Sequence, residues 1–213
     1  TNGCVDTSRT ITPRVDPLPV AQLTTNDADN QVCRGDSVIL NAAGGAAYRF
    51  ESVNGGILQQ GMSSQYVTAS VPDTTLIQVV VTDTNGCVDT SQAEQVIVNP
   101  LPQPQLVSSA GTAFCSGTSV AFSASGGERY AFARNGAVVQ DSTAANWLAG
   151  SGLQDGDSLS VLVTDSNACQ ADTALLLTVF DLPQVSLSSS ANNNTLCPGD
   201  TVRFVASGAR RYT

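Results

Sequence analysis

The chain has 213 residues and a net charge of −9, and it contains neither lysine nor histidine. Without these residues it lacks the most common general base and metal ligand as well as lysine Schiff-base chemistry, and its acidic balance disfavours binding to nucleic acid. We therefore expect a protein that is not an enzyme and holds no cofactor or metal. No apolar run reaches the eighteen or so residues of a membrane span.

One phrase occurs three times at an interval of 82 residues. It begins at Cys33 as CRGDSVILNAAGG and returns at Cys115 and Cys197. A fixed period of this size is typical of tandem repeats, so we expect the chain to be a piece of a longer repeat protein. The predicted units are residues 1–16 (the end of a preceding repeat), 17–99, 100–181 and 182–213 (the start of a following repeat).

A second phrase, TNGCVDTS, stands near the N-terminus and returns at residues 84–91 and, in looser form, at residues 166–173. Asparagine followed by glycine after a β-branched run is a strong hairpin signal, because both residues tolerate positive φ. We therefore predict that Asn85 and Gly86 form a turn between the last two strands of a repeat.

Short segments rich in proline separate the repeats. Proline fixes φ and has no N–H donor, so neither a helix nor a central strand continues through them. A proline-rich connection of a few residues is also stiff, which favours neighbouring repeats held end to end. The predicted linker residues are Pro100, Pro102 and Pro183.

Within the first complete repeat, alternating apolar and polar residues predict seven strands and no helix. Val38 and Leu40 are expected to share a buried face, and Tyr48 and Phe50 are expected to point inwards. Seven short strands separated by turns indicate an antiparallel β-sandwich. The predicted strands are residues 19–25, 37–41, 47–51, 57–60, 65–69, 75–83 and 88–98.

The second repeat follows the same pattern, with Trp147 near the place of Tyr66. Its aromatic residues, like those of the first repeat, recur with the period of a strand. We therefore interpret Tyr130, Phe132 and Trp147 as core residues and not as a surface for stacking sugars.

Cysteines recur at two positions of the repeat, one before the second strand and one after the Asn-Gly turn. In a chain without histidine that we expect to be secreted, this pattern favours disulfides, and the close spacing of a zinc site is missing. The disulfide candidates are Cys4, Cys33, Cys87, Cys115, Cys169 and Cys197.

Two pairings stay open. A strand of six residues spans about 20 Å, whereas the Cα atoms of a disulfide lie within roughly 7 Å. If Cys33 and Cys87 lie at opposite ends of one sandwich, they cannot pair, and the best hypothesis joins Cys33 to Cys169 of the next repeat. Cys87 and Cys115 would then have partners outside this chain. A miscount by one strand would instead favour Cys33 with Cys87.

Three motifs suggest specific chemistry but are better explained as turns and loops. The tripeptide Arg-Gly-Asp at residues 34–36 is replaced by Ser-Gly-Thr at residues 116–118 and by Pro-Gly-Asp at residues 198–200, so its glycine is fixed and its arginine varies, which favours a turn over integrin recognition. The oxygen-rich residues 26–30 lack the pattern of a twelve-residue calcium loop, so we predict a solvated loop. Asp83 and Asp165 precede the hairpin turns and are expected to cap them.

The phrase at Cys33 with its following Tyr48-Arg-Phe, and VTDTNGC with its following NPLP, resemble the Ig-like and PKD-like repeats of giant Bacteroidetes cell-surface proteins. That family includes gliding adhesins and filaments exported by the type IX secretion system. The PKD hallmark of an aromatic residue followed by Asp-Gly-Asp is absent, which favours the Ig-like branch. The resemblance covers the whole chain. It implies tandem immunoglobulin-like antiparallel β-sandwich repeats, arranged end to end at the cell surface.

Two functions follow as expectations. The first is a structural stalk of an extracellular adhesin or filament, which gives length and mechanical continuity for attachment or motility. Its partners would be the neighbouring repeats, further copies in a homo-oligomeric bundle joined at strand edges, and a glycan or cell-surface ligand bound elsewhere on the parent protein. The alternative is a glycan-binding or spacer module of a secreted polysaccharide-degrading enzyme, which an exposed aromatic row would favour.

Overall fold

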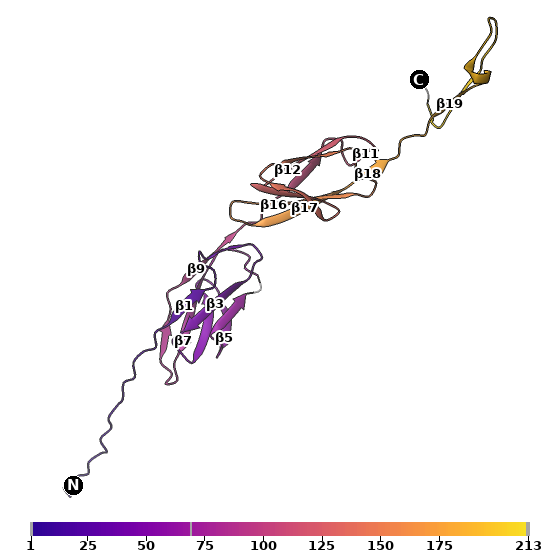
Figure 1. Cartoon of the computed structure of the whole chain (residues 1–213). Helices are drawn as coiled ribbons and strands as arrows, with labels where there is room; N and C mark the ends of the chain where they lie inside the picture. Colours follow the sequence, from indigo (N-terminus) through magenta and orange to yellow (C-terminus); the bar gives the residue numbers. More distant parts are fainter. Residues whose placement is uncertain (1, 69, 212–213) are drawn as a thin grey trace. The chain divides into compact units, whose positions relative to one another are not determined.

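The computed structural model describes residues 2–68 and 70–211. The protein is all-β, and the chain forms two compact units, Thr1–Leu101 and Pro102–Thr213 (Figure 1). Each unit contains one β-sandwich, and the second also holds a separate two-stranded hairpin. The predicted strand at residues 65–69 and the predicted outer segments include residues 1, 69, 212 and 213, which lie outside the described part. The four-part division stays a prediction.

The first sandwich packs a sheet of order β1-β3-β6 against a sheet of order β2-β9-β7-β4-β5, and β8 pairs with β7. The first segment contributes to both sheets, because β1 pairs antiparallel with β3 and β2 then pairs in parallel with β9. This strand order is immunoglobulin-like. The strands are β1 (Gln22–Thr25), β2 (Gln31–Cys33), β3 (Val38–Ala43), β4 (Ala47–Ser52), β5 (Ile57–Gly61), β6 (Gln65–Thr68), β7 (Thr75–Thr82), β8 (Val88–Thr90) and β9 (Glu94–Asn99).

The second sandwich repeats this plan. One sheet has the order β10-β12-β15, the other has the order β14-β13-β16-β17, and β11 pairs in parallel with β18. The strands are β10 (Gln105–Ser108), β11 (Ala113–Cys115), β12 (Val120–Ser125), β13 (Arg129–Arg134), β14 (Ala137–Ser142), β15 (Asn146–Gly150), β16 (Ser158–Thr164), β17 (Gln170–Leu176) and β18 (Thr178–Phe180).

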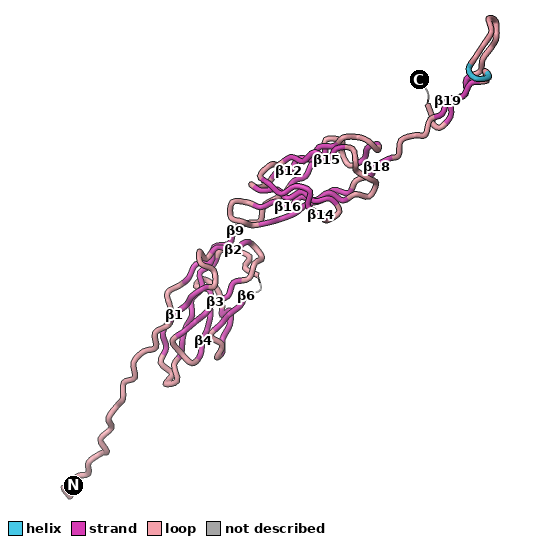
Figure 2. The backbone as a smooth tube through the Cα atoms, viewed as in Figure 1, coloured by secondary structure: helices cyan, strands magenta, loops and turns pink. Residues whose placement is uncertain are grey.

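The second sandwich is followed by an antiparallel hairpin of β19 (Ser186–Ser189) and β20 (Phe204–Ser207). A single 3-10 turn at Asn192–Asn194 interrupts the loop between them and is drawn in cyan in Figure 2. It is the only helical element among the described residues, so the expectation of no helix holds apart from this one turn.

The core of each sandwich lies between its two sheets. Val38 and Leu40 are 1% and 0% exposed, which confirms their shared buried face, and Phe50 is fully buried. Tyr48 lies at the edge of the core, where its hydroxyl donates to the Gly45 carbonyl at 2.7 Å. Alternation along the strands therefore places the apolar side chains inwards, as predicted.

The aromatic residues of the two cores correspond. Tyr66 lies opposite Leu40 in the β3–β6 ladder, and Trp147 lies opposite Phe122 in the β12–β15 ladder. The Trp147 ring is 5.7 Å from Phe122 and 6.4 Å from the Phe132 ring, measured between centroids. Phe122 and Phe132 are fully buried, and Tyr66 and Trp147 are partly buried and pack against the two cores, which agrees with the inward phase that the sequence pattern predicts.

The predicted number of strands was wrong. The described residues form nine strands in each sandwich instead of seven. β2 and β11 were not predicted, because a three-residue strand is too short to show alternation and its parallel partner is far away in sequence. The strand predicted at residues 88–98 is divided into β8 and β9 by residues 91–93, and the corresponding region of the second sandwich is divided into β17 and β18 at Leu177.

Candidate functional site at the ends of each repeat

The chain enters each sandwich at one end and leaves it at the other. In the first unit, the N–H of Ala46 donates to the Thr82 carbonyl at the entrance end, and the N–H of Val98 donates to Thr74 Oγ1 at the exit end. β7 connects these ends, and an eight-residue strand spans roughly 23 Å at about 3.3 Å per residue. Tension applied to the chain therefore acts along the strands.

The entrance end depends on a pair of glycines at the close of the repeated phrase. Gly44 has a φ of +104°, and a Cβ on it would lie 1.9 Å from the Val20 carbonyl oxygen. A Cβ on Gly126 would lie 2.3 Å from the Gln103 carbonyl oxygen. A Cβ on Gly208, in the third copy, would lie 1.7 Å from Gln184. The sequence shows that these glycines recur with the repeat. Only the structure shows that they leave room for the backbone of the segment that enters the sandwich.

The entrance end also carries the hairpin turn. Asp83 Oδ1 accepts hydrogen bonds from the N–H groups of Asn85 and Cys87, both at 2.8 Å, and Gly86 has a φ of +85°. Asp165 Oδ1 does the same for Asn167 and Cys169 at 2.9 Å. The prediction that these aspartates cap their turns is confirmed.

The exit end carries the tight turn of the Arg-Gly-Asp tripeptide. The N–H of Cys33 donates to Asp36 Oδ2 at 3.3 Å, and the N–H of Asp36 donates back to the Cys33 carbonyl at 2.9 Å. Cys197 and Asp200 form the same turn at 2.8 and 3.1 Å. The tripeptide is thus a repeat turn, as predicted.

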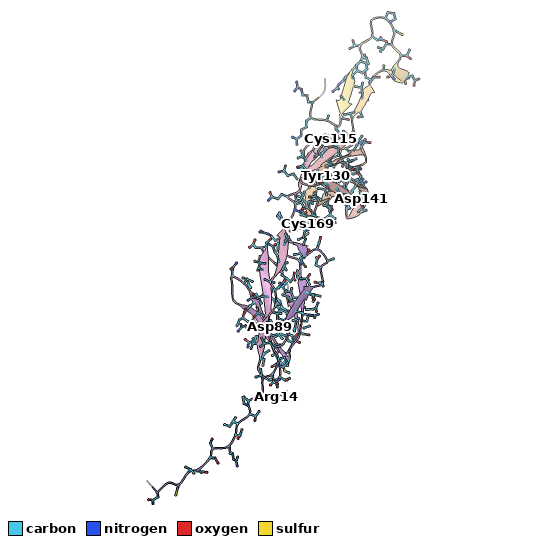
Figure 3. All side chains as sticks on the ribbon, turned by 90° about the vertical axis from the view of Figure 1, so that its left-hand side faces the viewer. Arg14, Asp89, Cys115, Tyr130, Asp141 and Cys169 are labelled. Carbon is cyan, nitrogen blue, oxygen red and sulfur yellow. The ribbon has the colours of Figure 1, made fainter. Side chains whose placement is uncertain are left out.

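The cysteines lie at these two ends. Cys33 is the last residue of β2 and pairs with Asn99, the residue before the linker, so it lies at the exit end of the first sandwich. Cys169 follows the capped turn at the entrance end of the second sandwich and is fully buried. Figure 3 labels Cys115 and Cys169 at opposite ends of the second sandwich.

Cys33 and Cys169 are both in the disulfide-bonded state. The other cysteines that the structure describes are free thiols, namely Cys4, Cys87, Cys115 and Cys197. The alternative pairing of Cys33 with Cys87 does not occur, because Cys87 is a thiol at the opposite end of the same sandwich. Strand counting missed two strands, yet it placed the two cysteine positions at the correct ends.

The predicted linker residues belong to two connections. Pro100 and Pro102 lie between β9 and β10, and Pro183 lies between β18 and β19. Within the described residues these connecting segments contain no strand or helix.

A buried carboxylate stabilises the exit end of the second sandwich. Asp157 is 4% exposed, and its oxygens lie 2.7 Å from Arg134 Nη2, from Asn135 Nδ2 and from the N–H of Gln154. Burial raises the pKa of Asp157, but the hydrogen bonds from Gln154, Asn135 and Arg134 outweigh it, so the net pKa is lowered.

The oxygen-rich loop at residues 26–30 uses its side chains internally. Asn26 Oδ1 accepts the N–H of Ile39 at 2.8 Å, and Asp27 Oδ1 accepts the N–H of Asp29 at 3.3 Å. The hydrogen bond between the two carboxyl groups raises the pKa of Asp27 and lowers the pKa of Asp29. These contacts fit the loop predicted from the sequence.

Among residues 2–68 and 70–211, no group of three or more His, Cys, Asp and Glu side chains is arranged to hold a metal ion. The same residues include no helix that is long and apolar enough to cross a membrane.

No protein-family model and no curated protein matches this chain. Among solved structures, it is similar to the fibronectin(III)-like modules of Clostridium thermocellum CbhA, with 12% identity, a TM-score of 0.43 and coverage of 75% of this chain and 95% of that chain. It is also similar to a Ca2+-stabilised adhesin that helps an Antarctic bacterium bind ice, with 15% identity, a TM-score of 0.46 and coverage of 84% and 53%. A third similarity is to a 1.5-MDa bacterial ice-binding adhesin, with 16% identity, a TM-score of 0.39 and coverage of 82% and 70%. At these levels the similarities carry no argument about function.

Proposed function

We propose that this chain provides structural spacer repeats for an extracellular adhesin or filament at the cell surface. The observation that carries the proposal is the layout of each sandwich. The chain enters at one end and leaves at the other, and the cysteines stand at those same ends. A repeat built in this way adds length with every copy, and its role involves no catalytic step.

The bonded cysteines support a mechanical contribution to the proposed spacer role. Cys33 and Cys169 are bonded, and the remaining described cysteines are thiols. Cys33 lies at the end that leads into the linker, and Cys169 lies at the end that follows it. The proposed pairing of Cys33 with Cys169 would join consecutive repeats by a second covalent connection besides the proline-rich linker.

Peptide mapping without reduction tests this pairing directly. We expect one linked species that contains the Cys33 and Cys169 peptides, and its loss after reduction. Recovery of Cys33 linked to Cys87 would contradict the pairing.

The repeated phrases that resemble Bacteroidetes surface proteins extend the proposal to a gliding-adhesin-like protein exported by the type IX system. Immuno-electron microscopy on intact cells that produce the parent protein tests the location. Antibodies raised against this chain are expected to label surface filaments without permeabilisation. Labelling that requires permeabilised cells would contradict an extracellular role.

Lateral association of copies is part of the same proposal. β6 and β15 are edge strands, and each exposes one large apolar side chain, Val67 at 52% and Leu148 at 67%. Free strand edges template association unless they are protected. Light scattering on a chain with several repeats is expected to show oligomers, and a monodisperse monomer would count against bundling.

The alternative, a glycan-binding module of a secreted enzyme, would be favoured by an exposed row of aromatic side chains. Phe50, Phe122 and Phe132 are fully buried, so these side chains present no row to a polysaccharide.

A further inference from the structure

An open cavity of about 450 Å³ lies in the first unit. β5 and the turn that precedes it line one side, and β6 and the segment leading to β7 line the other. Its apolar surface comes from Leu58, Tyr66, Val71 and Ile77. Val71 and Ile77 are 5% and 3% exposed, so the cavity reaches the core of the sandwich. The volume falls within the range of small-ligand pockets.

In the second repeat, an ion pair spans the positions that correspond to the cavity lining. Ser52 pairs with Ile77 in the first unit, and Arg134 pairs with Leu159 at the same place in the second. The Arg134 guanidinium binds Asp157 at 2.7 Å and the Gly152 carbonyl at 2.8 Å. The first unit has Ser52 and Thr75 at these positions, and their hydroxyl oxygens lie 3.4 Å apart. Two short side chains therefore replace a bridging ion pair.

The lining is rich in hydroxyl groups and carries a single acidic side chain. This residue, Asp73, is already paired with Arg34 at 3.0 Å, so the lining offers no unmatched charge to a ligand. Hydroxyl groups both donate and accept hydrogen bonds, which suits a ligand that also carries hydroxyls. Besides Tyr66, the hydroxyl residues of the lining are Ser52, Thr68, Ser70, Thr74 and Thr75. Thr68 Oγ1 donates to the Ser70 carbonyl, Thr74 Oγ1 accepts the N–H of Val98, and the hydroxyls of Ser52 and Thr75 bond each other, so a ligand would use the further hydrogen bonds that these hydroxyls can still make.

We propose that this cavity binds a neutral pyranose residue of a carbohydrate chain. A pyranose ring combines an apolar face, which fits Tyr66 and Leu58, with a hydroxylated rim, which fits the threonines and serines. The site goes beyond the spacer role, which places ligand binding elsewhere on the parent protein. It distinguishes the two repeats, because only the first has the short side chains that leave the space open.

Saturation-transfer difference NMR on the full chain tests the ligand class. The probes are methyl β-D-glucopyranoside, methyl β-D-galactopyranoside, methyl α-D-mannopyranoside and, as an anionic comparison, methyl β-D-glucuronide. At least one neutral glycoside is expected to receive saturation on its ring protons, and the glucuronide is expected to bind several-fold more weakly. No transfer to any neutral probe, or equal binding of the glucuronide, would overturn the proposal.

A graft from the second repeat tests the location. Ser52→Arg combined with Thr75→Asp installs the ion pair that bridges the space in the second sandwich, and it is expected to weaken binding of the neutral probe at least tenfold. Leu76→Thr is the matched control, because the exposed Leu76 lies on β7 between two lining residues but does not itself line the cavity. Its affinity is expected to stay within twofold of the wild type.

Leu58→Arg provides a second variant should the double graft fail to fold. Leu58 is 39% exposed on an edge strand, so the change leaves the buried core in place while it narrows the cavity. Unchanged affinity in a folded cavity variant would place the binding elsewhere and overturn the assignment. These outcomes are independent of the spacer role, which peptide mapping and surface labelling test.

Discussion

At the scale of single residues, Asp157 shows how one repeat differs chemically from the other. It is buried with Arg134 at the exit end of the second sandwich, where the first sandwich has Thr75 and Ser52. The pKa of Asp157 is lowered in the folded protein, since its hydrogen bonds outweigh burial. Its unfolded value is about 3.9. Its stabilising contribution is therefore complete above about pH 4 and is lost as the pH falls through the lowered folded pKa.

This carboxylate predicts an acid-sensitive second repeat. Trp147, the only tryptophan, lies in that core and reports its unfolding by fluorescence. Asp157→Asn is expected to lower the free energy of unfolding at pH 7 by about 1–3 kcal/mol, because charged hydrogen bonds are lost. It is also expected to reduce the dependence of stability on pH below about pH 4. Urea titrations at several pH values measure both effects, with the exposed Asp172→Asn as control. An unchanged pH dependence would contradict the assignment.

The capped turns give a second prediction at this scale. Asp165 Oδ1 accepts two backbone hydrogen bonds, so Asp165→Ala leaves two N–H groups without their acceptor. The expected loss is about 1–3 kcal/mol of unfolding free energy, measured by Trp147 fluorescence in urea. Asp165→Asn keeps one acceptor oxygen and is expected to lose less. Equal losses for the two variants would show that the cap does not act through this oxygen.

At the scale of elements, the sequence predicts the strands that are long enough to show an alternation of apolar and polar residues. Val38 and Leu40 on β3, and the turn after β7, follow from local pattern and turn chemistry. β2 could not be predicted in this way, because its three residues form a strand only by pairing with a parallel strand more than sixty residues away. The cavity was also not predictable. It depends on whether the residue at this position of the repeat is short, as Ser52 is in the first sandwich, or long and paired with a carboxylate, as Arg134 is in the second.

The glycine pair at the entrance end makes a prediction about strand packing. Gly127 has ordinary φ, but a Cβ on it would lie 2.4 Å from Val163 Cγ1 and 2.7 Å from the Thr164 carbonyl oxygen. Gly127→Ala is therefore expected to lower the unfolding free energy by about 1–3 kcal/mol through overpacking. Gly152→Ala is the control, because a Cβ there meets no atom within 4 Å. Equal urea midpoints for the two variants would contradict the close approach.

At the scale of the whole molecule, the proposed spacer role depends on how tension passes from one repeat to the next. Each sandwich receives the chain at one end and releases it at the other, and β2 pairs in parallel with β9 so that its last residue, Cys33, lies beside the departing strand. A bond from Cys33 to Cys169 would carry load past the linker and past the chain enclosed by the bond. The disulfide would thus keep residues 34–168 from extension, whereas β1, β2, β17 and β18 lie outside the enclosed segment and stay under load.

Single-molecule pulling on the two ends of the chain tests this claim most directly. With the disulfide intact, residues 34–168 are expected to contribute nothing to the extended length. Addition of a reductant is expected to release about 135 further residues, which corresponds to roughly 450–490 Å at about 3.3–3.6 Å per residue. Extension of both sandwiches in the oxidised chain, in the same steps as in the reduced chain, would contradict the account.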